Sequence, residues 1–343
     1  MTLSALSVII DRHARGYPLT RARITTSKGS IEMIKDTKKS IFTHPLVITL
    51  TALLCCALWG SATPFIKTGY ELMMPERNVS STILFAGVRF AIAGLLTVLI
   101  YSVARRKVLV PKLENTPRIL LVSLFQTVLQ YIFFYVGLQN TTGVKGTIAS
   151  GSSAFFGVLI ASLIFRQEKL TVKKIVACIL GFAGIVLVNL NGLELTMNFL
   201  GDGFVIFSAI ALATSSVFMK KFSKYEDPVL ISGYQFIVGG IFLMILGFAL
   251  GGRIVVNFPA AVGVLLYLAA LSAVAYALWG LLLKFNPVSR VTVFSFTTPI
   301  FGTILSEIML SESSGTKPLN LVITLLLVSS GIFLLNYKPR SEQ

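Results

Sequence analysis

The sequence predicts an all-α integral membrane protein in which ten transmembrane helices form two inverted five-helix repeats. Apolar residues make up 55% of the 343 positions and charged residues only 13%, about half the charged share of a typical soluble domain. A membrane-spanning helix needs roughly 20 apolar residues, because the hydrocarbon core is about 30 Å thick. Stretches of that length follow one another from Leu46 to Tyr337, so the lipid bilayer is the expected surrounding.

Short polar segments divide this apolar region into ten predicted helices. We place them at residues 45–67, 82–104, 117–138, 147–165, 172–190, 201–220, 229–250, 260–283, 291–310 and 319–337. Because the connecting segments are short, successive helices are expected to cross the membrane in opposite directions.

Basic residues gather at one predicted face of the membrane. The formal charge of +16 comes mainly from Lys and Arg in the N-terminal arm and in the segments after the second, fourth, sixth and eighth helices. Cytoplasmic loops carry such an excess under the positive-inside rule. Both termini are therefore predicted to face the cytoplasm, in the cytoplasmic membrane, and the charge does not indicate a nucleic-acid partner.

Residues 1–44 form a basic arm ahead of the first helix, and residues 338–343 form a short cytoplasmic tail. The apolar run 3–10 is too short for a signal anchor, so one interpretation of the arm is a cytoplasmic extension. The other interpretation is that translation starts at Met33, because residues 28–30 can be encoded by a purine-rich stretch that resembles a ribosome-binding site. A peptide from residues 1–32 in the natively expressed protein would exclude the second interpretation.

Sequence elements recur between two halves of the chain, residues 45–190 and 199–337. Gly, Phe and Gly of the stretch 87–94 return at the same spacing in the stretch 233–240. Each half holds five predicted helices, and because five is odd the second half is expected to enter the membrane upside down. Inverted repeats place a substrate site near the membrane midplane, and rocking of one half against the other gives alternating access.

Several motifs resemble the EamA family of the drug/metabolite transporter superfamily. They are Ala-Leu-Trp-Gly-Ser-Ala-Thr-Pro-Phe-Ile-Lys at 57–67, Arg-Phe at 89–90, Glu-Lys-Leu-Thr at 168–171, Thr-Pro at 298–299 and Glu312. The similarity covers about residues 46–337. The resemblance implies a secondary active transporter of small metabolites such as amino acids, and we predict export or exchange.

Two positions depart from the family pattern. Phe155 stands where the fourth helix usually has a proline, so this helix is expected to be less kinked. Glu307 is acidic where the family usually has a small apolar residue. A carboxylate inside a span is costly and is expected to face a cavity or a base, which makes Glu307 the candidate proton-coupling group. An interfacial glutamate or half of a structural ion pair is the alternative.

Two prolines and one arginine inside predicted helices have more than one interpretation. Pro64 cannot donate to the carbonyl of Gly60, nor Pro299 to that of Ser295, and each carbonyl needs another partner. A kink that opens a polar pocket and a bend satisfied by a neighbouring hydroxyl both remain open. For Arg89 we favour a structural charge that pairs helices over a group that binds a substrate carboxylate.

Uncharged hydrogen-bonding side chains lie beside aromatic rings on several predicted helices. This mixture suits a small zwitterionic or amphipathic solute, although the same residue types also join helices. We expect the substrate to contact Trp59, Ser61, Gln126, Gln130, Tyr135, Ser150, Tyr276, Trp279 and Thr297.

Other function classes find less support in the sequence. Both histidines precede the first helix, and no acidic cluster lies within a span, so neither a metal site nor a cofactor is expected. The sequence has no Walker motif, so an ATP-driven pump is not expected. The three cysteines are interpreted as small packing residues. A multidrug or other efflux carrier, and a polytopic membrane enzyme, remain the alternatives. A proton is the candidate coupling ion, and both a monomer and a homodimer are open.

Overall fold

The computed structural model describes residues 40–74, 76, 78–190, 196–256, 259–310 and 318–336, and every regular element in these residues is helical. The expectations about the arm before residue 40, the tail from residue 338 and Glu312 lie outside them. The α-helices are α2 (Pro45–Met73), α3 (Val79–Ala104), α4 (Thr116–Ser123), α5 (Gln130–Gln139), α6 (Gly143–Gly151), α7 (Ser153–Leu159), α8 (Val172–Val188), α9 (Phe204–Phe222), α10 (Pro228–Ala249), α11 (Pro259–Phe285), α12 (Val288–Thr292), α13 (Thr298–Leu310) and α14 (Pro318–Asn336).

Nine helical segments in the described part of the chain are long and apolar enough to cross a membrane. Several of them join shorter elements end to end, such as α4, the π-helix η3 (Leu124–Leu129) and α5. The helix α8 is apolar but has 17 residues, slightly fewer than the roughly 20 that a bilayer requires. The predicted all-α membrane fold is confirmed in this form.

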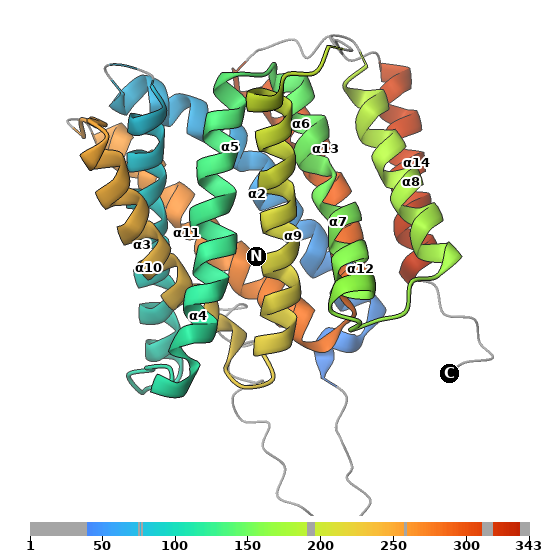
Figure 1. The fold of residues 1–343 in the computed structure, drawn as a ribbon, viewed down its shortest axis with the longest axis horizontal. Helices are drawn as coiled ribbons and strands as arrows, with labels where there is room; N and C mark the ends of the chain where they lie inside the picture. The colour runs from blue at the N-terminus through green and yellow to red at the C-terminus, as the bar shows by residue number, and fades with distance from the viewer. Residues whose placement is uncertain are drawn as a thin grey trace, which may run out of the picture.

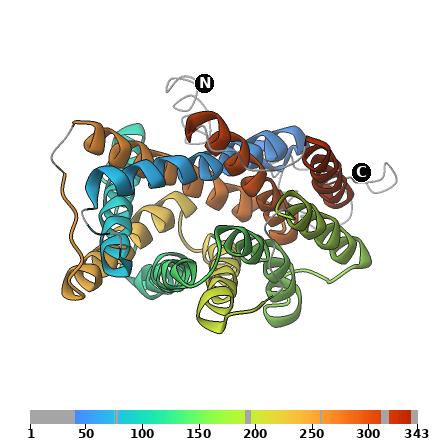
Figure 2. The same cartoon turned by 90° about the horizontal axis from the view of Figure 1, so that it is seen from above.

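The helices form one bundle with two ends (Figure 1). The helix α2 begins and α14 ends at the lower end in this view, which also holds the segments 105–112, 165–171 and 223–227. We call this the terminal end, and the opposite one the distal end. The helices α8 and α14 pack side by side at one edge of the bundle (Figure 2).

Glycines bring α3 and α10 into backbone contact. A Cβ atom at Gly240 would lie 2.4 Å from the amide nitrogen of Ala91, and one at Gly87 would lie 2.4 Å from that of Met244. Small residues at such positions let membrane helices approach closely. The close van der Waals packing then stabilises the helix pair, because the hydrophobic effect does not drive helices together inside lipid. The corresponding glycine stretches of the two halves therefore pack against each other.

The fourth predicted helix is interrupted although it lacks the proline of the family pattern. The helix α6 ends at Gly151 and α7 starts at Ser153, with Ser152 between them in a turn. The amide of Ser152 donates to the carbonyl of Ala149 at 3.2 Å and its hydroxyl donates to the same carbonyl at 2.5 Å. A hydroxyl that competes for a backbone carbonyl bends a helix. Phe155 itself lies inside the continuous helix α7, and the expectation of a helix less kinked than in the family stays a prediction.

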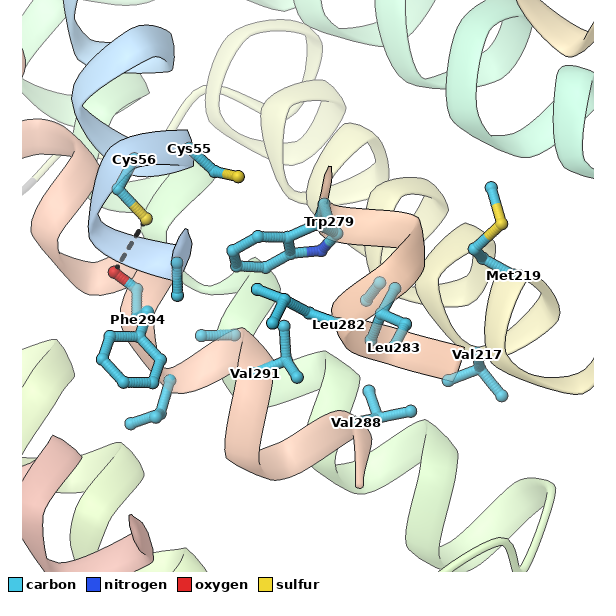
Figure 3. Close-up of a cluster of buried hydrophobic side chains, with 14 of the residues drawn as sticks. Cys55, Cys56, Val217, Met219, Trp279, Leu282, Leu283, Val288, Val291 and Phe294 are labelled. Carbon is cyan, nitrogen blue, oxygen red and sulfur yellow. Dashed lines mark hydrogen bonds between the residues drawn. The ribbon is translucent and has the colours of Figure 1, made fainter. Parts of the chain in front are cut away.

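A hydrophobic core fills the space between α2, α9, α11, α12 and the 3₁₀-helix η6 (Val293–Thr297) (Figure 3). Cys56 donates its thiol to the carbonyl of Phe294 at 3.2 Å, and Cys55 donates to that of Ala275 at 3.4 Å. Both thiols are buried and not in a disulfide, as expected of packing residues. Trp279 belongs to this core and also to the wall of the cavity described next.

Candidate functional site

A cavity of about 260 Å³ lies inside the bundle. Its walls come from α2, α3, α5, α6 and α7 of the first half of the chain, and from α9, α11, α12, η6 and α13 of the second half. Both halves of the chain therefore contribute, as expected of a site between two repeats. On α2, the lining residues Trp59, Ala62, Thr63 and Ile66 follow the spacing of one helical face.

Six of the nine predicted substrate contacts line this cavity. They are Trp59, Gln130, Tyr135, Ser150, Tyr276 and Trp279. The hydroxyl of Ser150 donates to the carbonyl of Gly146 at 2.7 Å, so its oxygen has only acceptor capacity left for a ligand. The cavity thus joins predicted residues from four separate helices.

Aromatic rings form much of the cavity wall. The ring of Trp59 meets those of Tyr276 and Trp279 edge to face, with centroids 5.1 and 4.9 Å apart. The hydroxyls of Tyr131 and Tyr276 lie 3.3 Å from each other. These contacts hold the rings in fixed orientations, which gives the cavity a defined apolar surface with a few polar atoms.

Three predicted contacts, Ser61, Gln126 and Thr297, do not line the cavity. Ser61 donates to the carbonyl of Leu58 at 2.7 Å, and Thr297 donates to that of Phe294 at 2.7 Å. Gln126 lies in η3, whose π-helical turns are wider than α-helical ones.

The two prolines have different local roles. Pro64 lies inside α2, one turn after Gly60, whose Cα faces α13 so closely that a Cβ there would meet the backbone of Gly302 at 2.8 Å. Pro299 falls in the first turn of α13, directly after η6. The carbonyl of Ser295, which Pro299 cannot reach, accepts from the amide of Thr298. The second proline therefore marks a junction between two helix types, and it lines the cavity.

Arg89 is the charged residue among the described residues that line the cavity. It lies about 15 Å along α3 from its start and about 22 Å from its end, and 3% of its surface is exposed. Its guanidinium lies over the rings of Phe90 and Tyr131, 4.3 and 5.8 Å from their centroids. Its Nε and Nη1 atoms have no hydrogen-bond partner in the described structure.

Arg89 of α3 contacts a second helix through the ring of Tyr131 on α5, and its structural role stays a prediction. No carboxylate among the described residues forms an ion pair with it. A desolvated cation–π contact is worth about 2 kcal/mol, whereas burying an ion costs several kcal/mol even after relaxation. The contact with Phe90 is therefore too weak to offset the burial of this charge alone.

Glu307 does not line the cavity. It lies three residues before the end of α13 and its side chain is exposed. In the described residues no group of three or more His, Cys, Asp or Glu could hold a metal ion. Residues that the sequence interpretation did not assign to substrate, such as Thr63, Phe134 and Ser216, also line the cavity; helical spacing from Trp59 could have identified Thr63.

Comparison with known proteins agrees with this architecture. The transporter YvbV of Bacillus subtilis (strain 168), itself described as uncharacterized, is 29% identical over 302 residues, which cover 86% of this chain and 94% of YvbV. A chloroplastic WAT1-related protein of Arabidopsis thaliana is 24% identical over 296 residues, which cover 83% of this chain and 68% of that protein. One crystal structure matches 84% of this chain over 97% of the length of the crystallised chain, with a TM-score of 0.69 and 17% identity. This match is a likeness of fold.

The family model of EamA-like transporters matches residues 46–190 and again residues 199–337. The first range contains the cavity walls from α2 to α7, and the second contains those from α9 to α13. The name of the family and the names of the relatives indicate a transporter rather than an enzyme. A multi-pass membrane protein with this twofold match belongs to the EamA-like transporter family of the drug/metabolite transporter superfamily.

Proposed function

We propose that the protein is a secondary active transporter that moves small metabolites such as amino acids across the cytoplasmic membrane by alternating access. The observation that carries this proposal is the cavity deep inside the bundle, walled by both family-matched halves. In this proposal α8 completes a set of ten membrane helices, and the two halves are inverted repeats. Export or exchange is the proposed direction.

Contacts at the terminal end support a closed gate on that side of the cavity. Glu168 accepts from the amide of Ser289 at 3.0 Å and from its hydroxyl at 2.5 Å, and Lys174 donates to the same carboxylate at 2.7 Å. Lys220 donates to the carbonyls of Leu283 and Asn286 at 3.0 and 2.6 Å. These bonds join the segment after η4 (Ile160–Ile164) to α12, and α9 to α11.

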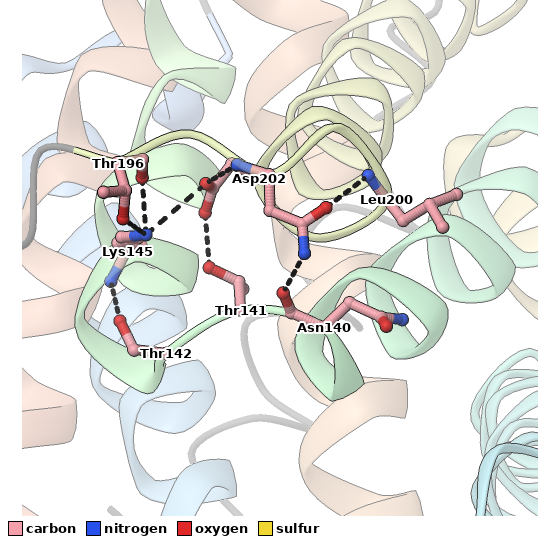
Figure 4. Close-up of polar contacts among 8 residues, drawn as sticks. Asn140, Thr141, Thr142, Lys145, Thr196, Leu200 and Asp202 are labelled. Carbon is pink, nitrogen blue, oxygen red and sulfur yellow. Dashed lines mark hydrogen bonds and ion pairs between the residues drawn. The ribbon is translucent and has the colours of Figure 1, made fainter.

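A second polar cluster joins helices at the distal end (Figure 4). Asp202 accepts from the hydroxyl of Thr141 and from the amide of Asn198, and Lys145 lies 3.7 Å from its carboxylate. Asn198 also donates to the carbonyl of Asn140 at 3.0 Å. This cluster ties the junction of α5 and α6 in the first half to the segment that leads into α9 in the second half.

Glu168→Gln is expected to open the terminal end more often. The substitution removes the charge but leaves an acceptor oxygen, so each of two or more hydrogen bonds weakens by about 1 kcal/mol. The open population should therefore rise about tenfold or more. The reporter is Thr292→Cys, because Thr292 lines the cavity and is buried. Its modification by a membrane-impermeant thiol reagent is measured in inverted vesicles, which expose the terminal end in the proposed orientation.

The matched control is Glu114→Gln, which removes an exposed carboxylate 3.7 Å from Lys112 at the same end. Exposed pairs contribute little, so the control should modify at the rate of the single Thr292→Cys protein. Equal rates for Glu168→Gln and this control would contradict the gate.

Counterflow in proteoliposomes tests the proposed function. Vesicles are loaded with a mixed pool of amino acids and nucleobases, and the uptake of each labelled compound is followed; saturable accumulation of one compound is expected. Glu307 stays the predicted proton-coupling group. Because it lies outside the cavity, Glu307→Gln should keep exchange and lose net flux driven by a pH gradient.

Failure of these experiments has distinct meanings. Wild-type flux in Glu307→Gln would contradict the coupling assignment alone. No accumulation of any pooled compound by folded protein would contradict the metabolite proposal. The apolar lining favours a second candidate, efflux of hydrophobic drugs, which the same assay tests with drugs in the loaded pool.

A further inference from the structure

Buried polar atoms without a partner concentrate at the cavity. In the described part of the chain, ten buried side-chain nitrogen and oxygen atoms have no hydrogen-bond partner, and six belong to residues that line the cavity. These atoms are Nε1 of Trp59, Nε and Nη1 of Arg89, Oε1 of Gln130, the hydroxyl of Tyr135 and Oγ1 of Thr298. Native proteins satisfy nearly all such groups with protein atoms, ordered water or a ligand, so this cavity offers a ligand several unused hydrogen-bonding positions.

The chemistry of these atoms selects the ligand. The Arg89 and Trp59 nitrogens can only donate, and the Tyr135 and Thr298 hydroxyls can also donate. A ligand that satisfies these donors must carry acceptor oxygens, and the charge of Arg89 favours an anion. Oε1 of Gln130 only accepts, so it has room for a donor of the ligand or of water. The planar guanidinium matches a carboxylate through two parallel hydrogen bonds.

We infer that Arg89 binds the carboxylate of the transported substrate, and that the substrate is a monocarboxylate with an apolar body. This inference rests on the proposed function, since it names the substrate class of the same cavity. Arg89 supplies a single positive charge among the described lining residues, which balances one carboxylate and leaves a phosphate dianion uncompensated. The rings of Trp59, Tyr276 and Trp279 pack edge to face beside it and provide an apolar surface for the rest of the molecule.

The position of Arg89 suits this role in an alternating-access carrier. It lies in the middle part of α3, far from either membrane surface, where an ionisable side chain is retained for function. Its α3 helix packs through glycines on α10 from the other half. A charge at this place can be reached from either end as the two halves move.

Intrinsic tryptophan fluorescence can measure occupancy of this cavity. The chain has two tryptophans, and both Trp59 and Trp279 line the cavity, so the signal reports on this site without a label. The probes are 3-phenylpropanoate and 3-phenylpropanamide, which have nearly the same shape and differ in the carboxylate. Both are titrated at neutral pH into the purified full-length protein, and the ratio of their dissociation constants is the readout.

We expect the wild-type protein to bind the acid about tenfold or more tightly than the amide. Arg89→Gln should bring the ratio close to one, and Arg89→Lys should keep part of it because the charge remains without the planar fork. The matched control is Arg105→Gln. Arg105 donates to the hydroxyl of Tyr101 at 2.8 Å in the turn that follows α3, and its loss should leave the ratio unchanged.

A ratio is used because a merely structural arginine would lower stability and affinity for both probes together. An unchanged ratio in Arg89→Gln, or a wild-type ratio near one, would overturn the inference. Tighter binding of 2-phenylethylphosphonate than of the acid would overturn the carboxylate assignment. Should Arg89→Gln fail to fold, Arg89→Lys carries the same comparison.

Binding and transport give separable results. The titration needs no gradient, so the acid preference can be present while counterflow detects no transport, and then the proposed function fails alone. Counterflow of uncharged compounds with no acid preference would remove the inference and leave the carrier in place.

Discussion

Gly240→Leu is expected to abolish the accumulation of folded protein. A Cβ at this position would lie 2.4 Å from the amide nitrogen of Ala91 and 2.9 Å from the carbonyl oxygen of Gly87. Both neighbours are backbone atoms, so α3 and α10 must separate along their whole contact. Overpacking usually destabilises a protein by about 1–3 kcal/mol. The cost of a clash between two backbones is expected to reach or exceed the upper value, because neither backbone can move aside by itself. The measurement is the size-exclusion profile of detergent-extracted protein, together with its thermal unfolding.

Gly263→Leu is the matched control for this substitution. Gly263 lies in α11, a helix that also spans the bundle, and a Cβ there meets no atom within 4 Å. A leucine on this exposed face should give a monodisperse peak and an unchanged unfolding temperature. A monodisperse Gly240→Leu protein with wild-type stability would show that α3 and α10 do not approach as described.

Ser150→Phe is expected to reduce substrate exchange to about 1% or less of the wild-type rate while the protein stays folded. Ser150 is half-buried and lines the cavity, so a phenyl ring there takes space that the substrate needs. Ligand pockets bury most of the ligand's surface, and little room remains in about 260 Å³. Counterflow in proteoliposomes measures exchange, and thermal unfolding measures the fold.

Ser150→Ala is the control that separates lost space from lost hydrogen bonding. It removes a bond to the carbonyl of Gly146 and the acceptor offered to substrate, each worth about 0.5–1.5 kcal/mol. Exchange should therefore fall by no more than about tenfold. Full exchange in the phenylalanine variant would show that the transport path avoids this cavity.

Most of the helices could be predicted from the sequence because bilayer thickness imposes a length on apolar segments. The helix α3 follows from the apolar stretch 82–104, and its observed start at Val79 lies three residues earlier. Trp59, Tyr276 and Trp279 were also predicted at the site, since aromatic residues at helical spacing inside spans share a face. Irregular backbone could not be predicted in the same way, because a π turn or a break at Ser152 depends on local competition for carbonyls.

The sequence by itself determined the membrane environment, the family and the repeated halves, because composition and motifs along the chain carry this information. Only the tertiary structure decided which polar residues meet. Ser61 and Thr297 have the same chemistry as Ser150 but lie outside the cavity. Arg89 is proposed to bind a ligand because its surroundings show rings and unpartnered nitrogens rather than a carboxylate. Those surroundings come from α3, α5 and α11, and the distances between helices are set by packing.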